Sequence, residues 1–336
     1  MGCGSSSSAG PLASTRVLLL GGGGCGKTTF VKQMKLNYRG GFSYGETHEV
    51  KLKLRSNILQ RLAIVLTEIE EKLPESAAPT VTVISKASSQ EYEFMQEEAE
   101  NFVSLTKAVV EALEFPEVKS YVTDHYFDAP WDFSLFSRAS TILSKGYQPT
   151  PQDILMCRSP TTGLHEYSFI VDNVELVFID VGGQRKERAT WAKAMENIGA
   201  VIYVASLAEY GIGLEEDNTK DRMIESLELF QRVFHSPKLA KIPTVLLLNK
   251  FDLLEQRLNM LPLSAVFTDY SGPDQDIESA YEFISSKFIH RTTLKPTEKE
   301  FVCERVCAID QDNFMKVFQI IKAMLVSSSL RASGLG

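Results

Sequence analysis

The sequence has no apolar run near the roughly 18 residues that a membrane-spanning helix needs. Its five cysteines are an odd number, without the paired spacings of a metal site and without a signal peptide, which favours a reduced cytosolic setting. It also lacks an excess of basic residues, and the net charge of -8 argues against nucleic acid as a partner. A length of 336 residues exceeds the usual single core and predicts about two domains.

The first motif that is present is an apolar strand leading into a glycine-rich loop, G-x-x-x-x-G-K-[ST]. Glycines let backbone N–H groups turn inward around an anion, and the following helix offers its positive N-terminal end to the same group. The alternative is a flexible glycine turn with a solvated lysine. Because an apolar strand precedes the loop and a helical pattern follows it, we expect a nucleoside triphosphate here. The candidate residues are Gly21, Gly23, Gly24, Cys25, Gly26, Lys27, Thr28 and Thr29.

Residues suited to phosphoryl transfer follow the loop and recur after a later apolar strand. Lys27 is expected to reach the β- and γ-phosphates, and the Thr28 hydroxyl is expected to bind Mg²⁺. The later strand ends in D-V-G-G-Q. There Asp180 would hold Mg²⁺ through water, Gly183 would donate its N–H to the γ-phosphate, and Gln184 would orient the attacking water.

An upstream loop with the pattern R-x-x-T-T adds two groups of the same kind. Thr161 would complete the Mg²⁺ ligands, and Arg158 would stabilise the charge that develops on the γ-phosphoryl oxygens. Each of these short motifs alone is typical of ordinary turns. Their order along the chain predicts a single site for hydrolysis of a nucleoside triphosphate.

The base of the nucleotide is indicated by N-K-x-D, which follows a buried-strand pattern and consists of Asn249, Lys250 and Asp252. A carboxylate such as Asp252 can accept from the N1–H and the 2-amino group of guanine, and adenine lacks that pair of donors. The alternative is a surface turn after a core strand. The presence of the glycine-rich loop makes this alternative less favoured. Asp252 then favours guanine over the adenine of a P-loop ATPase or kinase.

In this order the motifs resemble those of α subunits of heterotrimeric G proteins. The resemblance runs from about Arg16 to the C-terminus and includes R-x-x-T-T-G, D-V-G-G-Q-R-x-E-R, N-K-x-D and Cys307-Ala308. It implies an α/β fold, in which a P-loop GTPase core with a mostly parallel sheet flanked by helices carries an inserted all-α helical domain. It also implies that Leu155, Cys307 and Ala308 contact the nucleotide, with the Ala308 N–H facing the guanine carbonyl.

We divide the chain into a flexible, lipidated N-terminal tail (1–15), a Ras-like GTPase domain (16–45 and 157–336) and an inserted helical domain with its linkers (46–156). Apolar residues at Ile58, Leu62, Val65 and Ile69 form one stripe of a long helix within the insertion. By resemblance the insertion covers the nucleotide, and its return linker carries Arg158. An unrelated helical interaction module is the alternative.

The GTPase domain is predicted to alternate strands and helices, with the strands parallel because helices connect them. Strands are expected at 166–174, 200–205 and 301–306, and helices near 187–198, 219–234 and 275–288. A last helix carries a core stripe of Phe314, Val317, Phe318, Ile321 and Leu325. Every motif described above lies at the carboxyl end of a strand, where such sheets bind ligands.

The N-terminus fits M-G-x-x-x-[ST], which makes Gly2 a candidate for myristoylation and Cys3 for palmitoylation. Two acyl chains anchor a protein stably, whereas one holds only marginally. We therefore expect a peripheral protein on the cytoplasmic face of the plasma membrane, with a cytoplasmic pool. A plain Gly/Ser tail is the alternative.

The resemblance implies four kinds of protein partner: a βγ dimer, a receptor or other exchange factor, a regulator that accelerates hydrolysis, and an effector that the sequence does not name. The family's long N-terminal helix lies along the β subunit, and about fifteen Ser-, Gly- and Pro-rich residues stand in its place here. We expect a weakened βγ contact. The last eight residues resemble the receptor-binding tail, but Ser333 replaces the family's frequent cysteine, so ADP-ribosylation at that position is not expected.

Two departures from the family touch the nucleotide. Gly24 replaces a glutamate that latches the closed site, and the loop Val306-Cys307-Ala308-Ile309 lacks two hydroxyls of the usual T-C-A-T. Because these contacts are missing, we expect rapid spontaneous dissociation of GDP. Cys25 beside the phosphates is a candidate redox site with a lowered thiol pKa, against the alternative that a small side chain is merely required.

The expected function is a signalling GTPase that hydrolyses GTP to GDP and phosphate, acting as the α subunit of a heterotrimeric G protein downstream of a membrane receptor. Two alternatives stay open. One is a nucleotide-gated adaptor without useful hydrolysis, and the other is a self-activating GTPase that needs no receptor.

Overall fold

The computed structural model describes residues 13–88, 96–97, 99–125, 133–293 and 299–332. The chain divides into two compact units: the first comprises Met1–Gly41 and Pro160–Gly336, and the second comprises Phe42–Ser159. Gly2 and Cys3, the lipidation candidates, and the C-terminal Ser333 lie outside the described residues. None of the described helices is long and apolar enough to cross a membrane.

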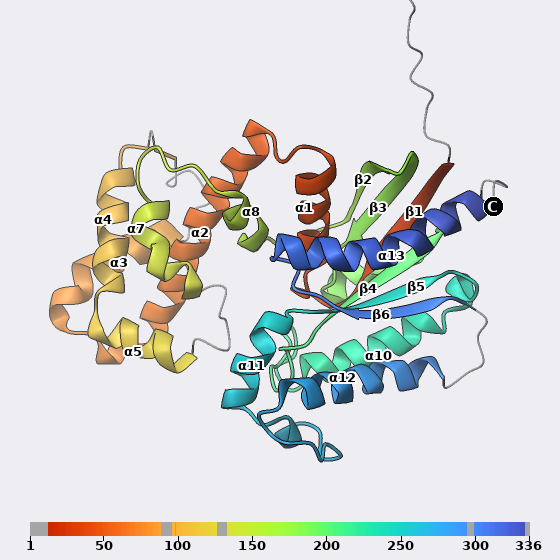
Figure 1. Cartoon of the computed structure of the whole chain (residues 1–336). Helices are drawn as coiled ribbons and strands as arrows, with labels where there is room; N and C mark the ends of the chain where they lie inside the picture. The colour runs from red at the N-terminus through yellow and green to blue at the C-terminus, as the bar shows by residue number, and fades with distance from the viewer. Residues whose placement is uncertain (1–12, 89–95, 98, 126–132, 294–298, 333–336) are drawn as a thin grey trace, which may run out of the picture. The chain divides into compact units, whose positions relative to one another are not determined.

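The first unit contains a six-stranded sheet and the helices that flank it (Figure 1). Its strands are β1 (Ala13–Leu20), β2 (Leu164–Val171), β3 (Val174–Val181), β4 (Ala200–Ser206), β5 (Thr244–Asn249) and β6 (Phe301–Arg305). Its α-helices are α1 (Lys27–Tyr38), α9 (Trp191–Ala194), α10 (Arg222–Phe234), α11 (Phe251–Met260), α12 (Ile277–Thr292) and α13 (Gln311–Ala332). Short 3₁₀ helices lie at Arg185–Thr190, Pro237–Leu239 and Leu263–Ala265.

The strand order is β2-β3-β1-β4-β5-β6. All neighbours pair in parallel except β2 and β3, which are antiparallel and join through Asp172 and Asn173, both with positive φ. Such a two-residue turn is the usual hairpin connection. The predicted strand at 166–174 was therefore wrong in extent and direction, because its end forms this turn and the first residue of β3. The α/β fold with a mostly parallel sheet is confirmed.

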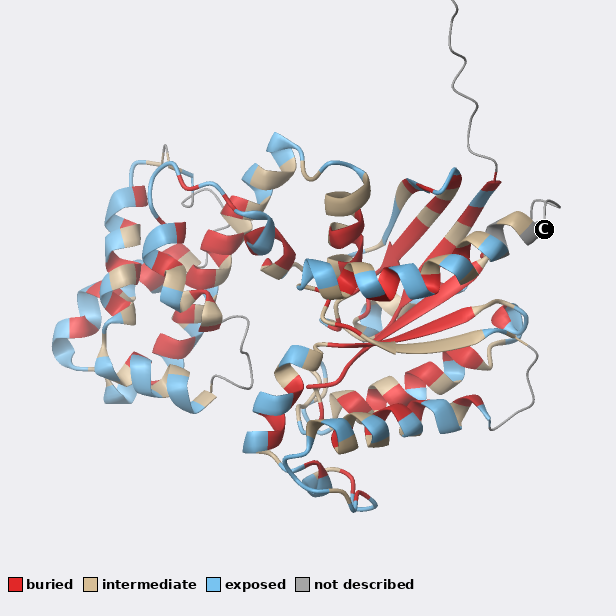
Figure 2. Cartoon of the chain, viewed as in Figure 1, coloured by how far each residue is buried: buried red, intermediate tan, exposed pale blue. Residues whose placement is uncertain are grey.

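The sheet is covered on both faces, which explains why its central strands are almost wholly buried (Figure 2). On one face Leu18, Tyr203 and Phe230 belong to a core that includes α10 and α12. On the other face Leu19 and Phe30 pack with α1 and α13. The stripe predicted for the last helix is buried in this second core, as Phe314, Val317, Phe318, Ile321 and Leu325.

One predicted helix differs in form. The segment expected as a helix at 187–198 is a 3₁₀ helix, Arg185–Thr190, followed by the four-residue α9. The Trp191 indole donates to the Gly182 carbonyl at 2.9 Å, and Thr190 Oγ1 donates to the Glu187 carbonyl at 2.7 Å. The helices expected at 219–234 and 275–288 are confirmed as α10 and α12.

All the secondary structure described in the second unit is helical, as predicted. Its α-helices are α2 (Tyr44–Glu68), α3 (Ala78–Ser88), α4 (Phe102–Leu113), α5 (Pro116–His125), α7 (Ala139–Ile142) and α8 (Pro151–Met156), with short 3₁₀ helices at Glu70–Lys72, Glu75–Ala77 and Phe136–Arg138. A capping box of Ser43 and Glu46 begins α2. The predicted stripe Ile58, Leu62, Val65 and Ile69 lies in the core of this unit.

A partly buried ion cluster ties the first half of α2 to the connection before α8. The Glu97 carboxylate accepts from Lys51 at 3.1 Å, from Arg55 at 3.0 Å and from the Gly146 N–H at 2.9 Å. The Arg55 side chain is fully buried, and its Nε donates to the Ile142 carbonyl at 2.9 Å. The Gly146 N–H, followed by the two cations, lowers the pKa of Glu97 from 4.5 to about 2.

We expect Glu97→Gln to destabilise the chain at neutral pH, because it removes the charge that Arg55 and Lys51 face. A folded-state pKa below the unfolded one means that Glu97 stabilises above pH 4.5 and loses this effect as the pH falls toward 2. The Glu97 side chain is 20% exposed, so we expect a loss of only about 1–2 kcal/mol. Thermal unfolding followed by circular dichroism from pH 7 to pH 3 tests this. The exposed Glu111→Gln on α4 is the control, and a pH-independent difference would contradict the assignment.

Candidate nucleotide site at the carboxyl edge of the sheet

The loop after β1 and the start of α1 form an anion cradle in the first unit. Gly21, Gly23, Gly24 and Cys25 lie in the loop, and Thr29 lies in the first turn of α1. Gly26 caps α1 with φ 111° and no side-chain cap, which leaves the first N–H groups of the helix without a side-chain acceptor. A Cβ on Gly26 would lie 2.1 Å from Asn249 Nδ2, so only glycine fits.

Lys27 turns into this loop. Its ammonium group donates to the carbonyls of Gly21 at 3.0 Å and Gly22 at 2.7 Å, and the residue is only 5% exposed. Buried charges are costly unless they are paired. The loop carbonyls hold the Lys27 ammonium group in the loop that is predicted to bind the phosphates.

Three oxygens from separate segments meet beside Lys27. Thr28 Oγ1 donates to Asp180 Oδ2 at 2.7 Å and lies 2.7 Å from Thr161 Oγ1. Asp180 is 1% exposed, and its other oxygen, Oδ1, has no hydrogen-bond partner among the described residues. Burial raises the pKa of Asp180, and the Lys27 charge opposes that shift.

The donor set at this point fits Mg²⁺. Two hydroxyls and a carboxylate are hard oxygen ligands, and Mg²⁺ keeps waters and substrate phosphates beside one or two such groups. The unpartnered Oδ1 of Asp180 is the kind of atom that a hydrated cation would satisfy. No group of three or more His, Cys, Asp or Glu suited to a metal occurs within the described ranges.

Gly183 brings the segment after β3 against the glycine-rich loop. A Cβ on Gly183 would lie 2.4 Å from Lys27 Nζ and 2.4 Å from the Gly22 carbonyl oxygen, so glycine is required for the approach. Arg188 Nε donates to the Gly183 carbonyl at 3.2 Å. Glu187 accepts from the Gly163 N–H at 2.9 Å and so links this segment to the loop that carries Thr161.

Asn249, at the end of β5, joins the glycine-rich loop to the segment after β6. Its Nδ2 donates to the Cys25 carbonyl at 2.8 Å, and its Oδ1 accepts from the Ala308 N–H at 3.0 Å. In this structure the Ala308 N–H thus donates to Asn249. Its assignment to the guanine carbonyl stays a prediction. Gln33 of α1 donates to the Ala308 carbonyl at 2.9 Å and fixes the same segment.

Lys250 and Asp252 begin α11. Lys250 has φ 62° and its ammonium donates to Glu209 Oε1 at 2.8 Å, whereas Asp252 lies exposed in the first helical turn. Burial, followed by the Asp252 charge, raises the pKa of the Cys307 thiol to about 12. Asp252 and Cys307 therefore lie close together.

Cys25 does not have the lowered pKa that we expected. The residue is 2% exposed, and its burial raises the thiol pKa despite the nearby Lys27 charge. A buried thiol with a raised pKa is unreactive, so the redox hypothesis for Cys25 was wrong.

Leu155 and Arg158 belong to the second unit. Leu155 is 4% exposed on α8. Arg158 is exposed, and its carbonyl accepts from Asn57 Nδ2 of α2 at 3.0 Å. These two residues are described within that unit, whereas the other candidate nucleotide residues lie in the first unit.

A model of the G-alpha family, described as G-protein alpha subunit, matches residues 6–325. The chain belongs to the G-protein α-subunit family. It is 32% identical over 335 residues to the guanine nucleotide-binding protein G(o) subunit alpha of Planorbella trivolvis, which covers 95% of this chain and 90% of that protein. It is 31% identical over 330 residues to the human guanine nucleotide-binding protein subunit alpha-15, covering 94% and 87%. It is 30% identical over 329 residues to the alpha-17 subunit of Caenorhabditis elegans, covering 95% and 90%.

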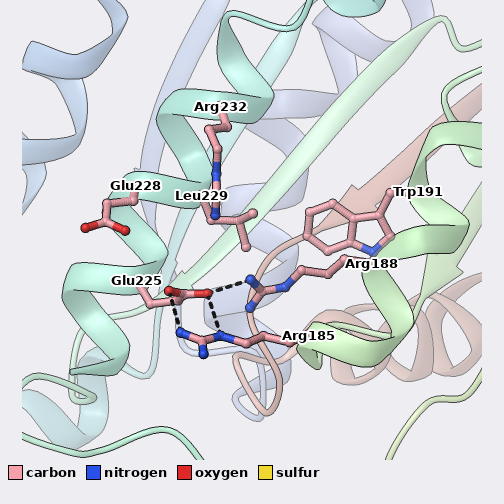
Figure 3. A pocket seen from close by; sticks show the side chains of 7 residues that line it. All are labelled: Arg185, Arg188, Trp191, Glu225, Glu228, Leu229 and Arg232. Carbon is pink, nitrogen blue, oxygen red and sulfur yellow. Dashed lines mark hydrogen bonds and ion pairs between the residues drawn. The ribbon is translucent and has the colours of Figure 1, made fainter. Parts of the chain in front are cut away.

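In this α-subunit chain, ion pairs hold the segment after Gly183 to α10 (Figure 3). Glu225 Oε1 accepts from Arg188 at 2.6 Å, and its Oε2 accepts from Arg185 at 3.2 Å. Burial opposes the charge of Glu225, but these two arginines lower its pKa. A cavity of about 460 Å³ lies here, lined by Arg185, Arg188, Trp191, Glu225, Glu228, Leu229 and Arg232.

Several residues that stabilise the site of this α-subunit chain were not predicted from the sequence. Gln33, Glu209 and Glu225 each fix a motif residue or its backbone through a hydrogen bond or an ion pair. Each comes from an element distant in sequence and has no motif of its own. Only the pairing of elements in the fold reveals them.

Proposed function

We propose that the chain is a GTP/GDP switch that hydrolyses GTP to GDP and phosphate as the α subunit of a heterotrimeric G protein. The observation that carries this proposal is the convergence of Thr28, Thr161 and Asp180 beside Lys27, at the edge of the sheet where Asn249 also lies. Guanine would be recognised by Asp252, with Lys250 and Cys307 beside it. Together these residues would offer one guanine nucleotide a positive charge for its phosphates, hard oxygen ligands for its Mg²⁺ and a carboxylate that recognises its base.

The phosphates would bind the N–H groups of the loop and of the first turn of α1, with Lys27 balancing their charge. Mg²⁺ would be held by Thr28 and Thr161, and by Asp180 through water. When bound, this ion neutralises charge on the phosphate oxygens.

Hydrolysis requires an oriented water and stabilisation of the charge on the departing γ-phosphoryl group. Gln184 would orient the water that attacks phosphorus, and the Gly183 N–H would donate to a γ-phosphoryl oxygen. Arg158 would stabilise the charge, carried by the linker of the second unit, which we propose to be the inserted helical domain. Loss of the γ-phosphate would release the loops around Thr161 and Gly183 and end the signal.

Single-turnover phosphate release from GTP-loaded protein tests this function, with ATP as the control nucleotide. Release from GTP alone supports a GTPase. Stable GTP binding without release would indicate a nucleotide-gated adaptor, and equal turnover of ATP would overturn the assignment of guanine. Comparison with the rate of GDP dissociation then separates a receptor-dependent switch from a self-activating one.

We expect rapid GDP dissociation, because Val306 and Ile309 offer no hydroxyl to the base and Gly24 offers no carboxylate latch. Ile309→Thr should slow GDP release about 2- to 10-fold, the effect of one regained hydrogen bond. Stopped-flow displacement of a fluorescent GDP measures the rate. Ile289→Thr, at an exposed position of α12, is the matched control. Equal rates in the wild type and in Ile309→Thr would count against a role for this position.

Membrane attachment and partners complete the proposal. Gly2 and Cys3 would carry the acyl groups that hold the protein at the cytoplasmic face of the plasma membrane. A βγ dimer, a receptor or other exchange factor, an accelerator of hydrolysis and an effector are the partner classes of such a switch. The segment after Gly183 is the part of the first unit through which the nucleotide state would be read.

A further inference from the structure

The side-chain amide of Gln184 is held by an acidic residue from another segment. Gln184 Nε2 donates to Glu215 Oε2 at 3.2 Å. Glu215 lies between β4 and α10, thirty-one residues away in sequence. A carboxylate only accepts hydrogen bonds, so the amide turns its nitrogen toward Glu215 and its oxygen elsewhere.

Glu215 is itself fixed in position. Its Oε1 pairs with Arg222 Nη2 at 3.5 Å, and Arg222 Nε donates to the Gly213 carbonyl at 2.9 Å. The Leu214 N–H donates to the Lys220 carbonyl at 3.0 Å, which closes the loop that carries Glu215. The neighbouring Glu216 accepts from the Arg185 N–H at 3.1 Å. Two adjacent carboxylates therefore hold Gln184 and the residue after it.

The Gln184 side chain lies against the glycine-rich loop. A Cβ built on Gly23 would lie 3.3 Å from Gln184 Cγ. The amide that Glu215 holds is thus next to the place assigned to the phosphates. A hydrogen donated to Glu215 is not available to a γ-phosphoryl oxygen. The negative charge of Glu215 also opposes the negative charge that develops on those oxygens.

We propose that Glu215 is a positioning residue that restrains the Gln184 amide and slows GTP hydrolysis until this hydrogen bond breaks. The inference rests on the proposed GTPase function and concerns the control of its rate. A partner that draws Glu215 away from Gln184 would accelerate hydrolysis without contributing a group to the reaction.

The test is single-turnover phosphate release by the GTP-loaded full-length chain carrying Glu215→Gln or Glu215→Ala. We expect both variants to hydrolyse GTP faster than the wild type, by about 3- to 10-fold, because Glu215→Ala removes an exposed hydrogen bond to a charged group and Glu215→Gln leaves only a weaker, neutral acceptor. GDP dissociation should stay unchanged, since neither Gln184 nor Arg222, the two partners of Glu215 described above, is assigned to the base. Glu282→Gln, an exposed glutamate on α12, is the control and should match the wild type.

A double variant separates positioning from a general effect on the fold. Glu215→Gln should give no acceleration in the Gln184→Leu background, because the restrained amide is gone. An equal or slower rate in Glu215→Gln, with a wild type that turns over, would overturn this inference alone. Acceleration that persists without Gln184 would also overturn it. Absence of phosphate release from every GTP-loaded variant and from the wild type would overturn the proposed function as well.

Discussion

Replacement of Gln184 by leucine is expected to slow single-turnover GTP hydrolysis by at least about 100-fold, the usual cost of removing one group that acts only in the transition state. Leucine keeps the size of the side chain but neither accepts from nor donates to the attacking water. Binding of GTP should persist, because Lys27 and the hydroxyls of Thr28 and Thr161 are untouched. The measurement is release of phosphate from protein loaded with γ-labelled GTP.

The control for this variant is Gln319→Leu, which makes the same chemical change at an exposed position of α13. It should hydrolyse GTP at the wild-type rate. Equal hydrolysis in Gln184→Leu and the wild type would show that another group orients the water. Faster loss of GTP itself from Gln184→Leu would assign the residue to binding.

Much of this arrangement could be predicted because each motif residue sits at the end of an apolar strand. Asp180 is the next-to-last residue of β3, Asn249 is the last residue of β5, and Lys27 follows β1 after one loop. Carboxyl ends of parallel strands meet at one edge of a sheet, so the strand pattern and the order of the motifs along the chain suffice to predict that such residues lie together. The buried stripes of α2 and α13 follow from helical periodicity in the same way.

What the sequence did not predict depends on contacts between distant elements. The Ala308 N–H is used by Asn249, and Gln184 is held by Glu215, because β5 pairs with β6 and the loop before α10 reaches the segment after β3. The pKa of the Cys25 thiol was wrongly predicted for a related reason. Proximity to a cation lowers a thiol pKa, but burial outweighs that effect here, and burial is a property of the packed fold.

The largest change in ligand preference is expected for Asp252→Asn. Guanine presents two donors, N1–H and the 2-amino group, and a carboxylate accepts both. Asparagine offers one acceptor and one donor, which matches the N1–H and the C2 carbonyl of xanthine instead. Because unmatched polar groups at a closed site are costly, we expect GDP affinity to fall by about three to four orders of magnitude and xanthosine diphosphate to become the preferred ligand.

Competition between GDP and xanthosine diphosphate for the purified protein measures this preference. Asp274→Asn is the control, because Asp274 accepts a hydrogen bond from Ser264 at 3.2 Å in a loop of the same unit and has no assigned contact with the base. Asp252 is exposed in the first turn of α11, so its replacement should leave thermal stability nearly unchanged. An unaltered preference for GDP in a folded Asp252→Asn variant would mean that other groups read the base.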